Sequence, residues 1–478
     1  MSTVRTRFAP SPTGFLHIGS VRAALYPWLL AKHFDGQFIL RIEDTDQARE
    51  VEGALDVIYE TLRWIGIDWD EGPDKGGPYG PYIQTERRAR YINWAEKIIA
   101  KGRAYADPRT PEELNKLRAI AKDRQRPFLA RDFRPDKAVA WQPGIPLRFL
   151  SEPRDYHWHD EVMGDLSAGI DAVDDFILIK SDGLPTYNFA HIVDDADMAI
   201  THVIRGLEYL ASMPKYLNLY EALELTAPKF VHMPHIMRPD GTKKLGKRDG
   251  AKSVLEYRDE GYLPDAMLNF LALLGWNPGT TQEIFSTQEL IDKFSIERVQ
   301  RGGAKFDERR LVWMNGNYIR NLSIDKLYDK AVTFWPEEAS TYDADYKKHV
   351  LGLIRERLKY LSEIPELTRF FFVDLPINSE LIDNNKNLTA LGNNKLRSLI
   401  IEAIEVLKNS DFSLDDLTQK LNALLQSTNE PPAILFSLIR IASTQAAVSP
   451  PLAASLSVLG KDRTIARLNQ QASALANK

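Results

Sequence analysis

Two short segments, far apart in the sequence, carry residues suited to phosphate chemistry. Residues 8–20 (FAPSPTGFLHIGS) combine two prolines that stiffen a loop, Gly14 and Gly19, which let the backbone approach a ligand, and His17, which can hydrogen-bond a phosphate oxygen. Residues 243–248 (KKLGKR) form a cation cluster that contains a glycine, as expected of a mobile clamp. Cations that reach a polyphosphate only in the transition state lower the barrier without over-binding the nucleotide. The pair predicts triphosphate chemistry.

Each segment also has an ordinary structural interpretation. A lone His-x-Gly sequence is found in many turns, and an isolated basic run is commonly a solvated loop. The elements around the first segment favour the functional interpretation, because the helix expected after it would offer its positive N-terminus to a phosphate.

The elements that must position these residues alternate between strand and helix patterns. Residues 4–8 form a β-favouring run and residues 21–34 have helical spacing; residues 38–42 are a second strand that ends at Glu43, and residues 51–64 are an amphipathic helix. This alternation predicts a parallel α/β sheet. Ligands of such sheets bind beyond the carboxyl ends of the strands, which places the first loop and Glu43 at the site.

The pattern changes twice further along the chain. From about residue 105 to 173 it breaks into Pro-rich and charge-rich pieces with short strands such as 145–149, which predicts an inserted subdomain. The α/β alternation then resumes, and beyond residue 263 the chain is predicted to be helical. The strands expected in the resumed part are 176–179, 200–204 and 230–233, and helical patterns include 266–274 after Pro264, 351–361, and 414–425 after a cap at Ser413.

Composition limits the class of protein. The 478 residues are 44% hydrophobic and include no cysteine, which excludes disulfides, thiolate zinc sites and a cysteine nucleophile. The start of the chain lacks the apolar core of a signal peptide, and no run reaches the roughly 20 apolar residues that span a bilayer. We therefore expect a cytoplasmic protein with no membrane partner. The net charge of −5 confines any RNA site to a local basic surface.

Longer stretches around the two segments resemble the bacterial glutamyl-tRNA synthetases, a family of class I aminoacyl-tRNA synthetases. Residues 10–20 are similar to the HIGH-type signature of the class, with Ser20 in place of the second His. Residues 244–248 are similar to its KMSKS-type loop. There Gly246 stands in place of Ser, which removes a hydroxyl near the phosphates. Further segments that match the family are 38–46 (FILRIEDTD), 71–86, 180–187 (KSDGLPTY) and 313–319 (WMNGNYI).

The resemblance implies an α/β fold, with a Rossmann-type parallel-sheet catalytic domain, an inserted α+β subdomain and an all-α C-terminal anticodon-binding region. The implied domains are 1–105 and 176–255 for the two halves of the catalytic domain, 106–175 for the acceptor-binding insertion, 256–325 for a helical stem-contact domain and 326–478 for the anticodon-binding domain.

The implied reaction is the ATP-dependent formation of glutamyl-adenylate with release of pyrophosphate, then transfer of glutamate to the terminal ribose of tRNA. His17, Lys244 and Lys247 are implied to be catalytic, because positioning and charge stabilisation dominate such displacements. ATP is expected with Mg²⁺, and the residues implied to bind it are Thr13, Gly14, His17, Gly19, Ser20, Glu208, Lys244, Leu245, Gly246, Lys247 and Arg248.

Glutamate presents two carboxylates and one ammonium group, so its pocket needs two cationic or hydroxyl-bearing poles and one anionic pole. Glutamine would leave an arginine buried without an anion, so no editing is expected. By their match to family positions, Arg7 and Tyr187 are implied to bind the side-chain carboxylate and Glu43 the ammonium group. Arg205 is implied to bind the other carboxylate, and Ser11 and His191 are implied to line the pocket. Taken without the resemblance, the two arginines are better explained as members of salt bridges.

The C-terminal helices are implied to read the anticodon, with Arg355 and Arg357 as candidates. Their spacing alone favours an ordinary exposed helix face. The expected partners are tRNA(Glu), with tRNA(Gln) left open as a second substrate, and the chain is expected to be a monomer. His157 and His159 share one side of a strand, but no third ligand is evident nearby and no zinc site is expected.

Other functions are considered on specific features. A glutaminyl-tRNA synthetase shares the catalytic signatures, but that family has β-barrels where this chain has helical patterns. A variant that charges both tRNAs stays open. A truncated tRNA-modifying paralogue is disfavoured because it lacks an anticodon domain. A nucleotidyltransferase is disfavoured because it does not need the glutamate-binding residues. A catalytically inactive RNA-binding relative is expected to have lost His17 or Lys247, and both are present.

Overall fold

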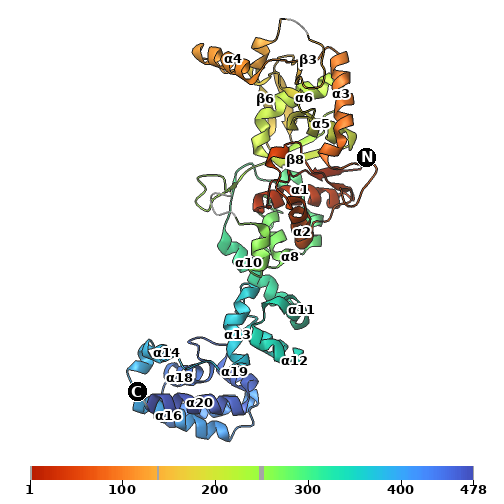
Figure 1. Ribbon diagram of the computed structural model, residues 1–478. Coiled ribbons are helices and arrows are strands. Elements are labelled where there is room, and N and C mark those ends of the chain that lie inside the picture. Colours follow the sequence, from red (N-terminus) through yellow and green to blue (C-terminus); the bar gives the residue numbers. More distant parts are fainter. Residues whose placement is uncertain (1–2, 137–138, 247–251, 477–478) are drawn as a thin grey trace. The chain divides into compact units, whose positions relative to one another are not determined.

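The computed structural model describes residues 3–136, 139–246 and 252–476, and the chain divides into two compact units (Figure 1). Unit 1 comprises residues 1–258 and 264–311, and unit 2 comprises residues 259–263 and 312–478. The five-part division expected from the sequence stays a prediction.

Unit 1 is built on two pairs of parallel strands. Strand β1 (Arg5–Phe8) pairs with β2 (Gln37–Leu40), and β8 (His202–Gly206) pairs with β9 (Lys229–Met233). The backbone N–H of Thr201 donates to the carbonyl of Arg5 at 2.9 Å, which joins the start of β8 to β1. The parallel pairing predicted for these strands is confirmed. Their carboxyl ends carry Phe8, Leu40 and Gly206, so the segments that follow them converge at one edge.

Helix α1 (Ile18–His33) connects β1 to β2 and is buried along most of its length. It begins three residues before the predicted range because the His17 side chain caps its N-terminus. Helix α2 (Ala54–Ile65) instead begins three residues after the predicted Val51. There the Val51 N–H donates to the Pro12 carbonyl at 3.0 Å, and Gly53 has a left-handed backbone with φ of 76°, so neither residue can belong to the helix.

The inserted segment forms an antiparallel sheet and a hairpin. Strands β3 (Ala104–Ala106), β4 (Leu147–Phe149) and β7 (Ile177–Ile179) pair in that order, all antiparallel. Residues 176–179 were expected to continue the parallel alternation; this expectation is wrong, because β7 pairs with β4 of the insertion and not with a strand of the parallel pairs. A short apolar run predicts a strand but does not encode its partner.

The hairpin of the insertion consists of β5 (Tyr156–Asp160) and β6 (Gly164–Ala168). The Glu161 N–H donates to the Phe230 carbonyl at 2.9 Å, which attaches the hairpin to β9 of the catalytic core. Figure 1 shows the insertion, with α4 (Pro111–Asp123), at one end of unit 1, and α1, α2 and α8 at the other.

The other elements of unit 1 complete a core between sheet and helices, in which Tyr91, Phe149, Phe189 and Leu219 are buried. They are α3 (Arg88–Ala100), α5 (Tyr187–Asp197), α6 (Met213–Ala222), β10 (Ile236–Met237), α7 (Val254–Asp259), α8 (Pro264–Ala272), α9 (Thr287–Lys293) and β11 (Ala304–Lys305); α10 (Glu308–Asn321) continues into unit 2.

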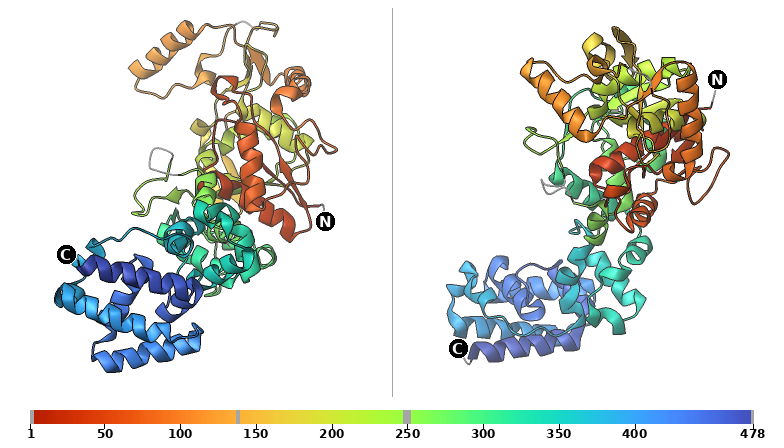
Figure 2. Two further views of the ribbon diagram at one scale, coloured as in Figure 1. Left: turned by 60° about the horizontal axis from the view of Figure 1, so that its bottom comes forward. Right: turned by 45° about the horizontal axis from the view of Figure 1, so that its top comes forward.

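The regular elements among the described residues of unit 2 are all helices, as predicted, and α16 and α20 lie side by side (Figure 2). The Ser413 side chain accepts from the Asp416 N–H and caps α17, as predicted. The predicted helix 351–361 is wrong: α12 ends at Ile354, and the N–H groups of Lys359 and Tyr360 donate to the Glu363 carboxylate instead of continuing it. The helices are α11 (Ile324–Lys330), α12 (Ala344–Ile354), α13 (Ile364–Phe372), α14 (Glu380–Asp383), α15 (Lys386–Thr389), α16 (Gly392–Lys408), α17 (Leu414–Thr428), α18 (Pro432–Thr444), α19 (Leu452–Leu459) and α20 (Lys461–Ala476).

None of the helices in the described ranges combines the length and apolar character needed to span a membrane.

Candidate active site

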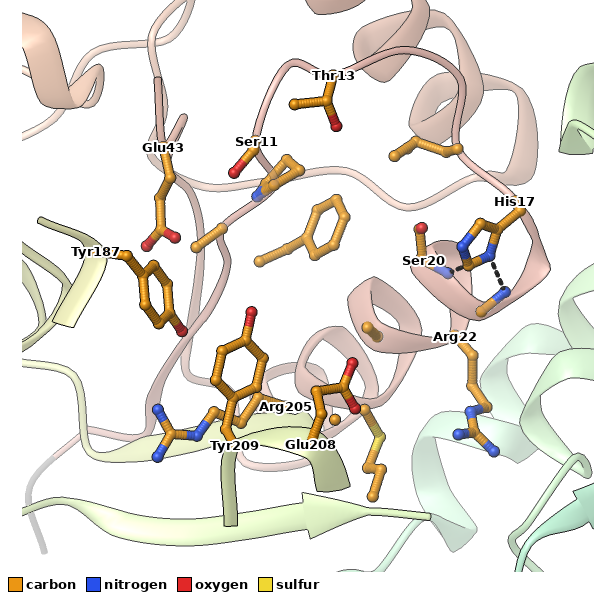
Figure 3. A pocket seen from close by; sticks show the side chains of 18 of the residues that line it. Ser11, Thr13, His17, Ser20, Arg22, Glu43, Tyr187, Arg205, Glu208 and Tyr209 are labelled. Atoms are coloured by element: carbon orange, nitrogen blue, oxygen red, sulfur yellow. Dashed lines mark hydrogen bonds between the residues drawn. The ribbon is translucent and has the colours of Figure 1, made fainter. Parts of the chain in front are cut away.

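A cavity of about 860 Å³ opens at the carboxyl ends of β1 and β8 (Figure 3). Five segments line it: the loop after β1 with the start of α1, the residues after β2, the end of the 180–187 segment, the end of β8 with residues 206–209, and residues 233–236 with 244–245. The cavity therefore lies where the strand pattern predicted a ligand site.

His17 has a fixed role in the first loop. Its Nδ1 accepts hydrogen bonds from the backbone N–H groups of Gly19 at 2.9 Å and Ser20 at 3.3 Å (Figure 3). Because backbone N–H groups only donate, Nδ1 carries the lone pair and the hydrogen of the neutral ring is on Nε2. A Cβ on Gly19 would lie 2.8 Å from the His17 ring, so the glycine is required there. His17 thus caps α1 through Nδ1, and its Nε2 carries a hydrogen.

The second segment meets the first one at this cavity. The Arg238 N–H donates to the Lys243 carbonyl at 2.9 Å and the Leu245 N–H to the Ile236 carbonyl at 2.8 Å, which makes a short hairpin that ends at the wall of the cavity. There the Nζ of Lys244 lies 3.1 Å from Oε1 of Glu208. After this segment, the Val254 N–H donates to the Leu16 carbonyl at 3.0 Å. Two sequence segments about 230 residues apart therefore border one cavity.

A chain of buried charges supports one side of the cavity. Arg7 donates from Nε and one terminal nitrogen to the two oxygens of Asp195, at 3.0 and 3.2 Å. Arg41 donates to the same Asp195 at 2.7 Å and to Glu43 at 3.0 Å. Burial opposes ionisation of Asp195, but Arg7 and Arg41 outweigh it and hold its pKa below the usual range, whereas burial raises the pKa of Glu43. The positive charge of Arg7 is therefore already paired with the Asp195 carboxylate before any substrate binds.

Arg205 has a different environment. Its Nε donates to Nε2 of His232 at 3.0 Å, and one terminal nitrogen lies 3.4 Å from Nε2 of His191. The rings of Tyr209 and Tyr216 lie 5.3 and 4.9 Å from its guanidinium carbon, which is favourable for a cation. The charge of Arg205 is thus held by imidazoles and aromatic faces rather than by carboxylates.

Tyr187 and His191 are stacked at the start of α5. Their ring centroids are 4.8 Å apart, and the Nδ1 of His191 lies 2.8 Å from the carbonyl of Tyr187, to which it donates. Burial and the nearby Arg205 lower the pKa of His191 to about 3, so its ring is neutral at physiological pH. Burial and Glu43 raise the pKa of Tyr187 well above its usual value, so its hydroxyl stays protonated and can donate.

Most of the site residues predicted from the sequence line the cavity together. Gly246 and His191 are not part of this lining: His191 lies buried behind Tyr187, and Gly246 follows the lining residue Leu245. Lys247 and Arg248 lie outside the described residues. The predicted residues that line the cavity are Arg7, Ser11, Thr13, Gly14, His17, Gly19, Ser20, Glu43, Tyr187, Arg205, Glu208, Lys244 and Leu245.

The two anticodon candidates belong to unit 2. Arg355 is half-buried directly after α12, with its Nε 3.6 Å from a carboxylate oxygen of Glu356, and Arg357 is exposed in the turn that follows. Neither continues the helix, so the alternative of an ordinary exposed helix face is not what the structure has at these positions.

Several residues of the site were not predicted. Lys180 and Tyr209 also line the cavity. Lys180 stands inside the matching segment 180–187, so its position was a usable signal, whereas Tyr209 lies outside the matching segments. Asp195, Arg41 and His232 act from behind the lining; Arg41 stands inside the matching segment 38–46, whereas no local pattern marks Asp195 and His232. Among the described residues, no group of three or more His, Cys, Asp or Glu side chains is arranged to hold a metal ion. His159 bonds instead to Asp165, at 2.7 Å.

Comparisons with known proteins agree along the whole chain. Residues 3–313 match the family model described as tRNA synthetases class I (E and Q), catalytic domain, and residues 326–472 match an anticodon binding domain. A glutamate–tRNA ligase of Clostridium botulinum (strain Hall) is 45% identical over 476 residues, covering 97% of each chain, and one of Clostridium tetani is 42% identical over 97% of this chain and 96% of its own.

The fold agrees as well. A crystal structure of a glutamate tRNA ligase from Elizabethkingia meningosepticum, in complex with its amino acid, matches with a TM-score of 0.89 and 34% identity, covering 99% of this chain and all of the other. The predicted fold class, a class I catalytic domain followed by an all-α anticodon-binding region, is confirmed. The chain belongs to the class I aminoacyl-tRNA synthetases, in the group described as tRNA synthetases class I (E and Q).

Proposed function

We propose that this chain is a glutamate–tRNA ligase that activates L-glutamate with ATP and transfers it to the 3′ end of tRNA(Glu). The observation that carries this proposal is the cavity that unites an anion-binding helix start, a lysine on a separate segment and Arg205, a cation with imidazole rather than carboxylate partners. The relatives that match over nearly the whole chain are glutamate–tRNA ligases, which supports it.

In the first step, a carboxylate oxygen of glutamate attacks the α-phosphorus of ATP, the bond to the β-phosphate oxygen breaks, and pyrophosphate leaves. No protein nucleophile is needed, so the residues act by positioning and by stabilising charge. The Nε2–H of His17 and the N-terminus of α1 offer donors to the phosphates. Lys244, and Lys247 outside the described residues, bring cations to the leaving pyrophosphate, with Mg²⁺ arriving as the partner of ATP.

The amino acid lies on the other side of the cavity. Glu43, whose carboxylate points toward Tyr187 in Figure 3, binds the ammonium group. Arg205 binds one carboxylate. Arg7 gives two of its donor nitrogens to Asp195 and has a terminal nitrogen, 3.4 Å from the Ile204 carbonyl, left to share the other carboxylate with the Tyr187 hydroxyl. Ser11 lines the same space.

Selection against glutamine follows from these charges. Glutamine keeps the carboxylate that Arg205 binds, but its side chain would present a neutral amide, with one oxygen and one NH₂ group, to the donors of Arg7 and Tyr187 in place of the other carboxylate. Losing one hydrogen bond between a charged donor and a carboxylate costs about 1.5 to 3 kcal/mol, which is a discrimination of about tenfold to a hundredfold. This supports accurate charging without an editing site.

In the second step, the terminal ribose hydroxyl of the tRNA attacks the carbonyl carbon of the adenylate and AMP leaves. The match of residues 326–472 to an anticodon binding domain supports unit 2 as the part that reads the anticodon, with Arg355 and Arg357 as contacts. A variant that also charges tRNA(Gln) with glutamate is the second candidate, since the same site would serve both tRNAs. A tRNA-charging role is consistent with the cytoplasmic, monomeric enzyme expected from the sequence.

Charging of purified tRNA(Glu) and tRNA(Gln) with radiolabelled glutamate tests the proposal. Charging of tRNA(Glu) alone is the expected result, and charging of both identifies the second candidate. The proposal fails if neither tRNA accepts glutamate while either one accepts glutamine.

A further inference from the structure

A buried carboxylate of the inserted hairpin lies directly behind Arg205. Asp160, at the end of β5, has no exposed surface, and its Oδ1 accepts from the backbone N–H groups of Val162 at 3.0 Å and Met163 at 2.9 Å. Its Oδ2 lies 2.6 Å from Nδ1 of His232, which is also fully buried. His232 is the residue of β9 that pairs with Arg205 in the β8–β9 register. Three residues from three strands thus form a line from the hairpin to the cavity.

These contacts determine where the hydrogen of His232 is. Asp160 is a fixed acceptor, because two backbone donors hold its other oxygen, so Nδ1 of His232 carries the hydrogen and donates. The Nε2 of His232 is then an acceptor, and it receives the Nε–H of Arg205 at 3.0 Å. His191 repeats this arrangement on a terminal nitrogen of Arg205, since its own Nδ1 donates to the Tyr187 carbonyl.

The contrast with Arg7 shows what this arrangement achieves. Arg7 is oriented by a direct bidentate pair with Asp195, which fixes the guanidinium and also neutralises it. A carboxylate placed directly on Arg205 would compete with the carboxylate of a substrate for the same cation. A neutral imidazole orients the guanidinium by a hydrogen bond and leaves its charge available to the cavity, while the carboxylate that fixes the imidazole stays one residue further away.

We propose that Asp160 and His232 are positioning residues of the amino-acid pocket: through one imidazole, they orient Arg205 toward the substrate carboxylate without neutralising it. The inference rests on the proposed function, because it assigns Arg205 a carboxylate substrate. It makes the inserted hairpin, which lines no part of the cavity, a determinant of amino-acid binding.

The substitution Asp160→Asn tests the pair with a change of one atom. The amide oxygen is kept in place by the Val162 and Met163 N–H groups, so the NH₂ group faces Nδ1 of His232. His232 must then accept at Nδ1 and carry its hydrogen on Nε2, which sets it donor to donor against Arg205. We expect the KM for glutamate to rise about tenfold to a hundredfold, the size of a lost hydrogen bond to a charged group, with the KM for ATP changed less than about twofold.

The matched control is Asp165→Asn on the same hairpin. Asp165 also bonds a histidine Nδ1, that of His159 at 2.7 Å, but this pair is exposed and touches neither His232 nor the cavity. Its kinetic constants are expected to equal those of the wild type. The assay is tRNA-dependent ATP–pyrophosphate exchange by the full chain, with glutamate and ATP varied separately. An unchanged glutamate KM in Asp160→Asn, or equal rises in the KM of glutamate and ATP, would overturn the proposal.

Two substitutions of His232 separate positioning from folding. His232→Gln places an amide oxygen near the Nε2 position and keeps an acceptor for Arg205; His232→Asn places its amide near Nδ1 and keeps only the contact with Asp160. We expect the glutamate KM of His232→Gln to stay within about threefold of the wild type and that of His232→Asn to rise at least about tenfold. Equal values, or the reverse order, would refute the proposal even if Asp160→Asn fails to fold.

The activity of the wild type distinguishes a failure of the proposed function from a failure of the positioning role. If the wild type does not exchange pyrophosphate with glutamate and tRNA(Glu), the proposed function itself fails. If it does, and Asp160→Asn behaves like Asp165→Asn, only the positioning role is wrong.

Discussion

The burial of His191 makes a quantitative prediction about stability and pH. The ring is buried between Tyr187 and Tyr216, and the charged groups that face it are Arg205 and Arg7, which disfavour a proton, and Asp195, which favours one. Burial and Arg205 together lower its pKa from 6.5 to about 3. An imidazole of the unfolded chain binds a proton below about pH 6.5. The native state therefore resists a proton that the unfolded state accepts.

The sign and size of the pH dependence of unfolding follow from the difference in proton binding between the folded and unfolded states. Between about pH 3 and pH 6.5 the unfolded state binds more protons at this residue, so the free energy of unfolding rises with pH, and above about pH 7 the contribution is constant. Each pH unit within this window is worth about 1.4 kcal/mol, so the wild type loses about 2 kcal/mol at about pH 5 relative to about pH 8 through His191 alone. His191→Asn keeps a donor for the Tyr187 carbonyl and removes the titrating group, so this loss should vanish.

Urea denaturation of wild type and His191→Asn at several values between about pH 5 and pH 8 measures the difference. Because unit 1 and unit 2 can unfold separately, the comparison uses the transition reported by residues of unit 1. His349→Asn, at an exposed position of α12 in unit 2, is the control and should leave that transition unchanged. Parallel pH dependences for wild type and His191→Asn would refute the assignment of His191 as a buried, neutral ring.

Two further predictions concern catalysis. His17→Asn keeps a side-chain acceptor at the N-cap of α1 but loses the Nε2–H, so we expect kcat to fall about a hundredfold while stability is retained. His17→Ala should in addition lose about 1 kcal/mol of stability, because it removes the cap. A wild-type kcat in His17→Asn would contradict the role of His17 in binding phosphate. Lys244→Ala should lower kcat for adenylate formation about a hundredfold and weaken ATP binding less than about threefold. The control is Lys243→Ala, because Lys243 is an exposed neighbour that does not line the cavity. Equal losses in kcat and ATP affinity would show that Lys244 acts only in binding ATP in the ground state.

The positions of Glu43 and Arg205 could be read from the sequence because both follow directly from strand patterns. A residue at or just after the end of a parallel strand lies at the ligand-binding edge whatever the rest of the fold does. Helix starts were less well placed, since they depend on side-chain caps such as His17 and on single backbone angles such as that of Gly53. Those features are decided by one or two local hydrogen bonds that hydrophobic spacing does not reveal.

The supporting charges could not be read from the sequence for a different reason. Asp195 is 188 residues from Arg7, and Asp160 is 72 residues from His232, so no local pattern relates them. Each carboxylate alone is indistinguishable from a surface residue until the tertiary structure buries it. The same holds for β7, whose apolar run predicts a strand but not the antiparallel partner that it has in β4. Sequence reasoning therefore located most of the residues that line the cavity and missed several of those that hold them in place.

The central claim is that the cavity selects an amino acid by its side-chain carboxylate, which Arg7 and Tyr187 bind. The most direct measurement is the ratio of kcat/KM for glutamate to that for glutamine in ATP–pyrophosphate exchange with tRNA(Glu) present. We expect a ratio of at least about tenfold in the wild type, collapsing toward equal values in Arg7→Gln through loss of glutamate activity. A wild-type ratio near unity, or an Arg7→Gln variant that keeps the wild-type ratio, would contradict this claim.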